Sequence, residues 1–177
     1  MRPTVDGPDE ESRPLSEAGL RQADALVAVL IESSPGRVLS SPYLRAVQTV
    51  APTAEALNVR VEKLDALREW DSGLEPTPAW ERHYREAWER PERAINGGES
   101  HLVLEQRAVH ALRELAADVR DEADVVVASH GTWIARALHG LGCPVDVTFW
   151  LSMPMPAVFV VQTDGERLDA TCRSLTL

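Results

Sequence analysis

Three side chains able to handle a phosphate group follow three predicted strands. Arg45, Glu69 and His130 each come shortly after a short apolar run of the kind that forms a buried strand. Ligands of open α/β sheets bind beyond the carboxyl ends of the strands. We therefore expect these three side chains to face one crevice at that edge of the sheet.

The predicted crevice suits an anion. Arginine offers a flat pair of donors, histidine adds another, and helices that start at Ser41 and Thr132 aim backbone N–H groups at the same edge. Phosphate is the anion that this combination favours. Taken singly, each side chain has a plainer interpretation: Arg45 as a salt-bridge partner, His130 as a helix cap and Glu69 as a surface carboxylate.

The elements that must position these residues alternate helices with strands. Such a pattern predicts an α/β fold of three layers, α/β/α, with a mostly parallel sheet in a single domain over residues 1–177. A hairpin around Asp164-Gly165 can add antiparallel strands at the edge of that sheet. The predicted elements are a loop over 1–14, helices over 16–32, 42–57, 79–90, 100–120 and 132–141, strands over 37–39, 59–63 and 124–129, and hairpin strands over 157–162 and 167–173.

Charge and composition limit the partners. The 28 acidic residues outnumber the 18 Lys and Arg residues, which gives a formal net charge of −10. Overall repulsion weighs against a nucleic acid or an anionic membrane as the main partner. The N-terminal stretch shows no apolar targeting segment, and no apolar run has the length of a membrane span, so we expect a cytoplasmic protein. The sequence leaves open whether the chain forms a homodimer.

The two cysteines, Cys143 and Cys172, belong to no CxxC pair. We therefore expect neither a structural zinc site nor a disulfide framework, and we interpret both as thiols without a role. The acidic residues show no metal-ligand spacing either, so we expect no metal cofactor.

Five short motifs follow one another along most of the chain. They are Pro14-Leu15-Ser16 with Gly19 and Gln22-Ala23, Ser40-Ser41-Pro42 with Arg45-Ala46 and Gln48-Thr49, Leu67-Arg68-Glu69 with Gly73, Gly97-Gly98-Glu99-Ser100, and Val126 to Gly131. Together they resemble the motifs of the histidine phosphatase superfamily, the phosphoglycerate mutase-like group. The resemblance implies the fold of that group and hydrolysis of a small phosphorylated metabolite without a metal ion.

The resemblance also implies roles for the three crevice residues. In that mechanism one histidine attacks phosphorus and becomes phosphohistidine, while a carboxyl group protonates the leaving oxygen and later helps water attack. By position, Arg45 is similar to the second phosphate-gripping arginine, His130 to the second histidine and Glu69 to the proton donor. Arg45 and His130 would bind the substrate phosphate.

One motif of the family is missing. The attacking histidine sits in an Arg-His-Gly motif directly after the first strand, and this sequence contains neither. Met1-Arg2-Pro3-Thr4 resembles sequence just downstream of that motif, so we expect an incomplete N-terminus and little or no phosphatase activity. Two explanations stay open: a chain that starts too late in a lineage of working enzymes, or a non-catalytic, phospholigand-binding pseudophosphatase. A missing inner strand also predicts unpaired strand edges and marginal stability.

The remaining candidates carry weaker signals. Between Leu74 and Asn96, three aromatic residues (Trp80, Tyr84 and Trp88) and three arginines (Arg82, Arg85 and Arg90) could form a lid that selects the substrate, although helical aromatics often belong to a core. The other histidines, His83, His101, His110 and His139, are interpreted as surface or packing residues. A serine hydrolase using Ser41 or Ser129 is disfavoured because no GxSxG elbow exists.

Overall fold

The computed structural model describes residues 9–118, 124–164 and 166–175. The elements in chain order are α1 (Glu17–Leu30), β1 (Arg37–Ser40), α2 (Leu44–Ala56), β2 (Val61–Lys63), the short 3-10 helix η1 (Asp65–Leu67), α3 (Trp80–Glu89), α4 (His101–Asp118), β3 (Val125–Ala128), α5 (Gly131–Gly140), α6 (Val147–Ser152), β4 (Val161–Thr163) and β5 (Leu168–Ala170). Parts of three predictions lie outside the described residues: the N-terminal loop up to residue 8, the end of the helix predicted over 100–120, and Gly165 of the hairpin turn.

Three parallel strands form the central sheet, with β1 between β2 and β3. In this register Ser40, at the end of β1, pairs with Lys63 on one side and with Ala128 on the other. The three strands therefore end at the same edge of the sheet. The segments that follow β1, β2 and β3 in the sequence therefore all begin at this edge.

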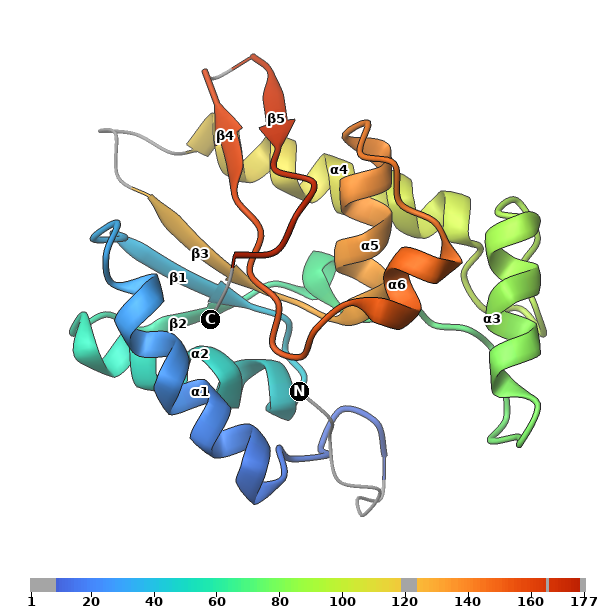
Figure 1. The fold of residues 1–177 in the computed structure, drawn as a ribbon, viewed down its shortest axis with the longest axis horizontal. Coiled ribbons are helices and arrows are strands. Elements are labelled where there is room, and N and C mark those ends of the chain that lie inside the picture. Colours follow the sequence, from blue (N-terminus) through green and yellow to red (C-terminus); the bar gives the residue numbers. More distant parts are fainter. Residues whose placement is uncertain (1–8, 119–123, 165, 176–177) are drawn as a thin grey trace.

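Alternate residues of the sheet face two separate cores. Leu39 and Val127 pack with Leu104 of α4 on one face, whereas Val38 packs with Val50 of α2 on the other. Figure 1 shows α1 and α2 on one side of the sheet and α4 and α5 on the other. Because side chains alternate along a strand, one short sheet anchors helices on both faces. The predicted three-layer α/β/α fold with a parallel sheet is confirmed.

The helices follow their predicted spans, with differences at the ends. Ser16 caps α1, since its hydroxyl accepts the Gly19 N–H at 3.2 Å. The prediction that Ser41 caps a helix beginning at Pro42 is wrong: α2 begins at Leu44, with Tyr43 as its cap residue. α6 has no counterpart among the predicted elements, because its 6 residues span too few turns to set up a periodicity. Among the described helices, none combines the length and apolar character needed to cross a membrane.

The C-terminal hairpin stands apart from the parallel sheet. β4 and β5 pair antiparallel around the predicted turn, but they form a two-stranded sheet of their own. The prediction that the hairpin extends the edge of the parallel sheet is therefore wrong. Among the described strands β3 pairs with β1 alone, so its second edge has no described strand partner.

Cys143 and Cys172 form a disulfide, which corrects their interpretation as thiols. Their Cα atoms lie 5.4 Å apart, a distance that a disulfide spans without moving the backbone. The bond joins the segment just before α6 to the residues that follow β5. It therefore closes a loop that contains α6 and the hairpin.

Candidate active site

Arg45 is buried in the first turn of α2, at the edge where the strands end. Its side chain reaches the N-terminal loop, where Nη1 donates to the Glu10 carbonyl oxygen at 2.6 Å and Nη2 donates to Glu10 Oε1 at 3.0 Å. The side chain of Arg45 is 10% exposed, whereas that of Glu10 is 50% exposed. An anion arriving from solvent can displace such a carboxylate, because an exposed partner keeps much of its hydration.

His130 is the cap residue of α5 and is also buried. Its Nε2 lies 2.8 Å from Ser41 Oγ, and its ring meets the Tyr43 ring edge-on at 5.0 Å between centroids. Burial lowers the pKa of His130 well below its usual value, and the positive charges of Arg45 and Arg107 lower the pKa further. The imidazole is therefore neutral at physiological pH until an anion compensates the positive charge around it.

Glu69 follows η1 and lies at the N-terminus of α5. Its Oε1 accepts the N–H groups of Trp70 at 2.9 Å and Trp133 at 3.2 Å. Burial raises the pKa of Glu69, and the backbone N–H of Trp70 and the charge of Arg45 offset only part of that rise. A carboxyl group that holds its proton more tightly than usual is suited to proton donation.

The structure brings Arg45, Glu69 and His130 together at one edge of the sheet. The charge of Arg45 lowers the pKa of both Glu69 and His130, so the guanidinium lies within electrostatic reach of both groups. The ring of Tyr43 contacts His130 and also lies under the guanidinium of Arg45, at 4.8 Å from centroid to Cζ. The geometry thus places the three residues as neighbours, and their catalytic roles stay predictions.

Other motif residues stabilise the segments around this crevice. Gln48 of α2 accepts the Leu15 N–H at 2.7 Å and so ties the start of α1 to α2. Glu99 pairs with Arg107 through two bonds of 2.9 and 2.8 Å, and Arg107 also donates to the carbonyl oxygen of Arg68 at 3.0 Å. The bond from Arg107 to the Arg68 carbonyl joins segments distant in sequence and holds the loop that carries Glu69.

A cavity of about 790 Å³ opens beside Glu69. Tyr43 and Glu10 line it near Arg45, and the cavity extends past Trp70 to the pair formed by Glu99 and Arg107. Its volume falls within the range of small-molecule sites. Among the described residues, no group of three His, Cys, Asp or Glu side chains is placed to hold a metal ion.

Sequence reasoning did not identify Glu10 as a neighbour of the predicted site, nor the contact that Ser41 makes with His130. Glu10 lies in an acidic loop, and nothing in its spacing indicates that it reaches Arg45. Ser41 was interpreted as a helix cap, and its contact with His130 depends on how β1 and β3 pair. Spatial neighbours of this kind carry no local sequence signal.

The contact between Ser41 and His130 bears on the serine hydrolase alternative. Ser41 is fully buried, so its hydroxyl cannot meet a substrate and instead positions the imidazole. Ser129 donates its hydroxyl to the Leu67 carbonyl oxygen at 2.8 Å, which leaves it with a structural role. The burial of Ser41 and the main-chain hydrogen bond of the Ser129 hydroxyl both weigh against a serine nucleophile here.

The four other histidines lie in helices, as expected. His101 is fully buried between Trp70 and Trp88, at 4.3 and 5.3 Å between ring centroids. His139 lies 2.7 Å from Glu105 Oε2 at the far end of α5, and His110 is exposed on α4. The interpretation of these three as packing or surface residues agrees with their places in the structure.

Comparison with known proteins identifies the family. Residues 9–175 match the model of the histidine phosphatase superfamily (branch 1). No curated protein matches the chain closely enough to count as a relative.

Solved structures of phosphatases and of a hydrolase resemble most of the chain. A mycobacterial glucosyl-3-phosphoglycerate phosphatase in complex with inorganic phosphate has 26% sequence identity and a TM-score of 0.75, over 98% of this chain and 91% of that chain. A protein called mycobacterial hydrolase 1 has 29% identity and a TM-score of 0.64, over 80% of this chain and 74% of that one. The phosphoserine phosphatase from Entamoeba histolytica in complex with 3-phosphoglyceric acid has 20% identity and a TM-score of 0.77, over 97% and 88%, and at that identity it supports the fold alone.

Proposed function

Because the chain belongs to the histidine phosphatase superfamily, we propose that its crevice binds the phosphate group of small phosphomonoesters, as a phosphatase of this type does. The observation that carries the proposal is the convergence of Arg45, Glu69 and His130 at the ends of the parallel strands. A cation, a neutral imidazole and a carboxyl group of raised pKa provide what a phosphoryl site needs.

Each group has a distinct task in this proposal. Arg45 grips two phosphate oxygens with its two terminal nitrogens after Glu10 has moved away. His130 takes up a proton as the dianion arrives and donates a hydrogen bond to a phosphate oxygen, since the negative charge raises the pKa of the imidazole. Glu69 gives its proton to the oxygen that leaves phosphorus, which turns the leaving group into a neutral alcohol.

The covalent step needs a second imidazole that this sequence does not supply. Its five histidines include no Arg-His-Gly motif, and among the described residues His101 and His139 lie in other parts of the fold. We therefore propose that the 177-residue chain binds phosphomonoesters and turns them over slowly or not at all. Loss of a covalent nucleophile costs several orders of magnitude in rate.

The similar mycobacterial structure supports the class of ligand. That protein is described as a glucosyl-3-phosphoglycerate phosphatase in complex with inorganic phosphate. The name of that protein includes a small phosphorylated metabolite, and inorganic phosphate is the ligand in that complex. We extend only the class, a small phosphorylated metabolite, to this chain.

Two measurements on the purified chain test the proposal. Calorimetric titration with inorganic phosphate is expected to show binding to one site, and binding should be lost in His130→Ala. Hydrolysis of 4-nitrophenyl phosphate is expected to stay near the background rate. Absence of phosphate binding would overturn the binding site, and robust turnover that His130→Ala abolishes would overturn the proposed lack of catalysis.

The second candidate is the pseudophosphatase, a protein whose role is binding alone. It predicts the same binding and the same lack of turnover for the 177-residue chain. The two candidates must therefore be distinguished by the sequence of the gene. Coding DNA upstream of Met1 that encodes, in frame, an apolar strand ending in Arg-His-Gly would assign the gene product to the enzymes. Absence of such a segment would favour the binding protein.

A further inference from the structure

Three aromatic side chains from two helices form a continuous surface, here called the aromatic wall: Trp80 and Tyr84 of α3 and Trp150 of α6. Tyr84 stacks on Trp150 with 4.9 Å between ring centroids and 21° between ring planes. Trp80 meets Tyr84 edge-on at 5.7 Å and Trp150 at 6.5 Å. Trp80 remains 46% exposed, so one end of the wall is open to solvent.

The other end of the wall adjoins the crevice. Trp150 Nε1 lies 3.5 Å from the position that a Cβ atom would take on Gly131, the residue directly after His130. The crevice charges act on the hydroxyl of Tyr84, because burial and the carboxylates of Glu69 and Glu10 raise its pKa while the charge of Arg45 lowers it. The wall therefore runs outward from the place where a phosphate would bind.

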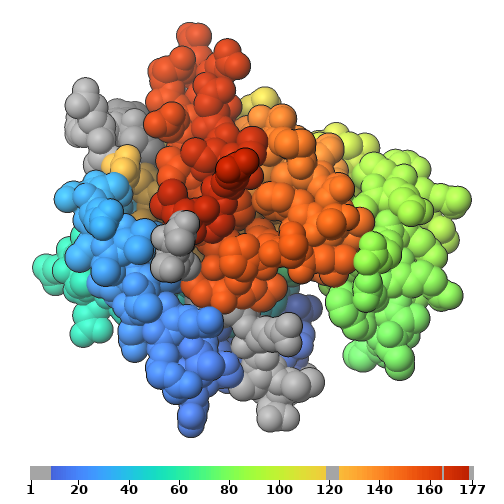
Figure 2. Space-filling model, in the orientation of Figure 1, coloured from blue at the N-terminus to red at the C-terminus, as the bar shows by residue number. Residues whose placement is uncertain are grey.

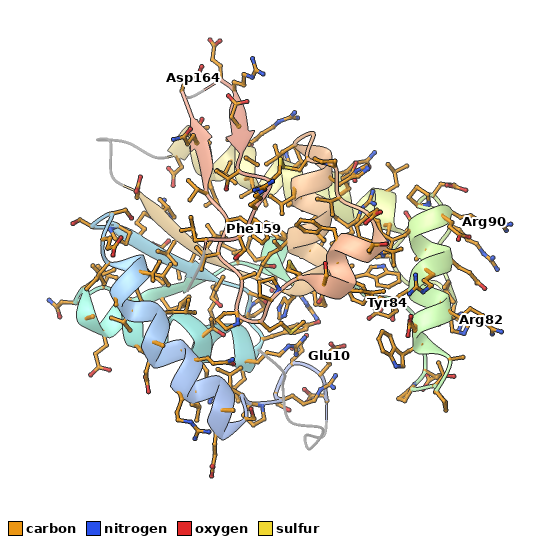
Figure 3. The ribbon with its side chains drawn as sticks, viewed as in Figure 1. Glu10, Arg82, Tyr84, Arg90, Phe159 and Asp164 are labelled. Atoms are coloured by element: carbon orange, nitrogen blue, oxygen red, sulfur yellow. A yellow bond between two sulfur atoms is a disulfide. The ribbon has the colours of Figure 1, made fainter. Side chains whose placement is uncertain are left out.

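The arginines of α3 do not contribute charge to this surface. Figure 3 shows Arg82 and Arg90 on the outer side of α3, away from Glu10, whereas Tyr84 lies on the inner side. Arg85 is paired with Glu81 of the same helix at 2.7 Å. Figure 2 shows the surface hollowed beside α3, below α6.

Charged groups of both signs surround the inner end of the wall. Glu10, Glu69 and Arg45 all act on Tyr84, and the nearby cations Arg68 and Arg107 are paired with Glu11 and Glu99. A leaving group with its own carboxylate or second phosphate would have to displace Glu11 or Glu99 before it could pair with one of these two cations. An uncharged group with an apolar face would instead meet the exposed ring of Trp80 and the stacked pair of Tyr84 and Trp150.

From this juxtaposition we propose that the aromatic wall is the subsite for the alcohol part of the phosphomonoester, and that it takes an uncharged ring. The ring would lie against Trp80 and Tyr84 while its phosphate occupies the crevice. The inference rests on the proposed function, since the crevice must bind phosphate for the wall to select what is attached to it. Aryl and glycosyl groups both offer an uncharged ring with an apolar face.

Calorimetric titration of the chain with four ligands tests the proposal. The ligands are inorganic phosphate, phenyl phosphate, glucose 1-phosphate and 3-phosphoglycerate. We expect at least one of the two ring esters to bind about tenfold more tightly than inorganic phosphate, because ring stacking adds an interaction that phosphate lacks. The ring ester that binds more tightly identifies an aryl or a glycosyl preference. We expect 3-phosphoglycerate to gain nothing over phosphate.

Variants show whether the gain comes from the wall. Trp80→Ala changes an exposed side chain, so the fold should tolerate it, and it should lower ring-ester affinity severalfold with phosphate affinity unchanged. Tyr84→Phe keeps the ring and should retain the preference, whereas Tyr84→Leu should lose it. Arg82→Ala, on the solvent side of the same helix, is the matched control and should leave all four affinities unchanged.

The two levels of the proposal fail in different ways. If inorganic phosphate and all three esters fail to bind, the proposed function is wrong and the inference falls with it. If phosphate binds but neither ring ester gains affinity, or if the gain survives both Trp80→Ala and Tyr84→Leu, the wall is not the subsite. If 3-phosphoglycerate binds more tightly than both ring esters, the proposed preference for an uncharged ring is wrong.

Discussion

The crevice and the aromatic wall are neighbours built in different ways. The crevice is held by main-chain geometry: parallel strands end together, and Glu69 accepts backbone N–H groups at the start of α5. The wall is held by contacts between rings of α3 and α6, which are far apart in the sequence. The first region concentrates charge in a buried place, and the second offers an apolar surface that is partly open.

This difference separates recognition of the phosphate from recognition of the rest of the ligand. A backbone-built site keeps its geometry when side chains around it change, whereas a wall of packed rings can be altered by one substitution. We therefore expect removal of Arg45 or His130 to weaken binding of every phosphomonoester. Changes in the wall should alter only the preference among them.

The largest expected effect is the loss of phosphate binding in Arg45→Ala. Removal of the guanidinium takes away two charge-assisted hydrogen bonds, so phosphate affinity should fall about 100-fold. Arg45→Lys keeps the charge without the two-pronged geometry and should lose about tenfold. Titration calorimetry measures both, with Arg113→Ala on the exposed face of α4 as the control. If the Arg45→Ala protein is folded and binds phosphate normally, the crevice is not the phosphate-binding site.

Reduction of the disulfide should affect the aromatic wall more than the crevice. The bond closes a loop with a sequence separation of 29 residues that contains α6, so its loss should lower the free energy of unfolding by about 3 kcal/mol. Chemical denaturation with and without a reductant measures this loss, and Cys172→Ser should reproduce it. Because α6 carries Trp150, ring-ester affinity should fall more than phosphate affinity. Equal losses for both ligands would show that the wall and the crevice are not independent.

The crevice residues could be predicted because each follows a strand, and parallel strands end at one edge. The wall could be predicted only in part. Trp80 and Tyr84 are visible as helical aromatics, but α6 is too short for a periodic pattern, and the stacking of Tyr84 on Trp150 depends on tertiary packing. The disulfide was missed for the same reason, since two cysteines without a motif give no sign that the fold brings their Cα atoms to 5.4 Å.

Acid should lower the free energy of unfolding through His101, which is buried next to the aromatic wall. Burial lowers the pKa of His101 from 6.5 to about 3, so below pH 6.5 the unfolded chain binds a proton that the folded protein refuses. Stability should therefore fall as pH drops from 6.5 toward 3, by about 1.4 kcal/mol per pH unit from this residue.

The matched variants isolate that contribution. His101→Phe should reduce the slope of unfolding free energy against pH by this amount, whereas His110→Phe, on an exposed position of α4, should leave the slope unchanged. Urea denaturation at pH 5, 6 and 7 provides the comparison. An identical slope in His101→Phe and in the unaltered chain would contradict the assignment.

The smallest expected effect concerns Glu10, which occupies Arg45 in this structure. Glu10→Gln removes a negative charge that competes with the ligand, so phosphate affinity should rise about threefold. Glu17→Gln, an exposed acidic position on α1, serves as the control. Unchanged or weaker binding in Glu10→Gln would show that the carboxylate does not compete for Arg45.

The structure of the chain in complex with inorganic phosphate tests the central claim most directly. Our account predicts phosphate oxygens within hydrogen-bond distance of Arg45 and His130, with the Glu10 carboxylate moved off the guanidinium. A phosphate bound elsewhere, with Glu10 still on Arg45 under saturating ligand, would contradict it.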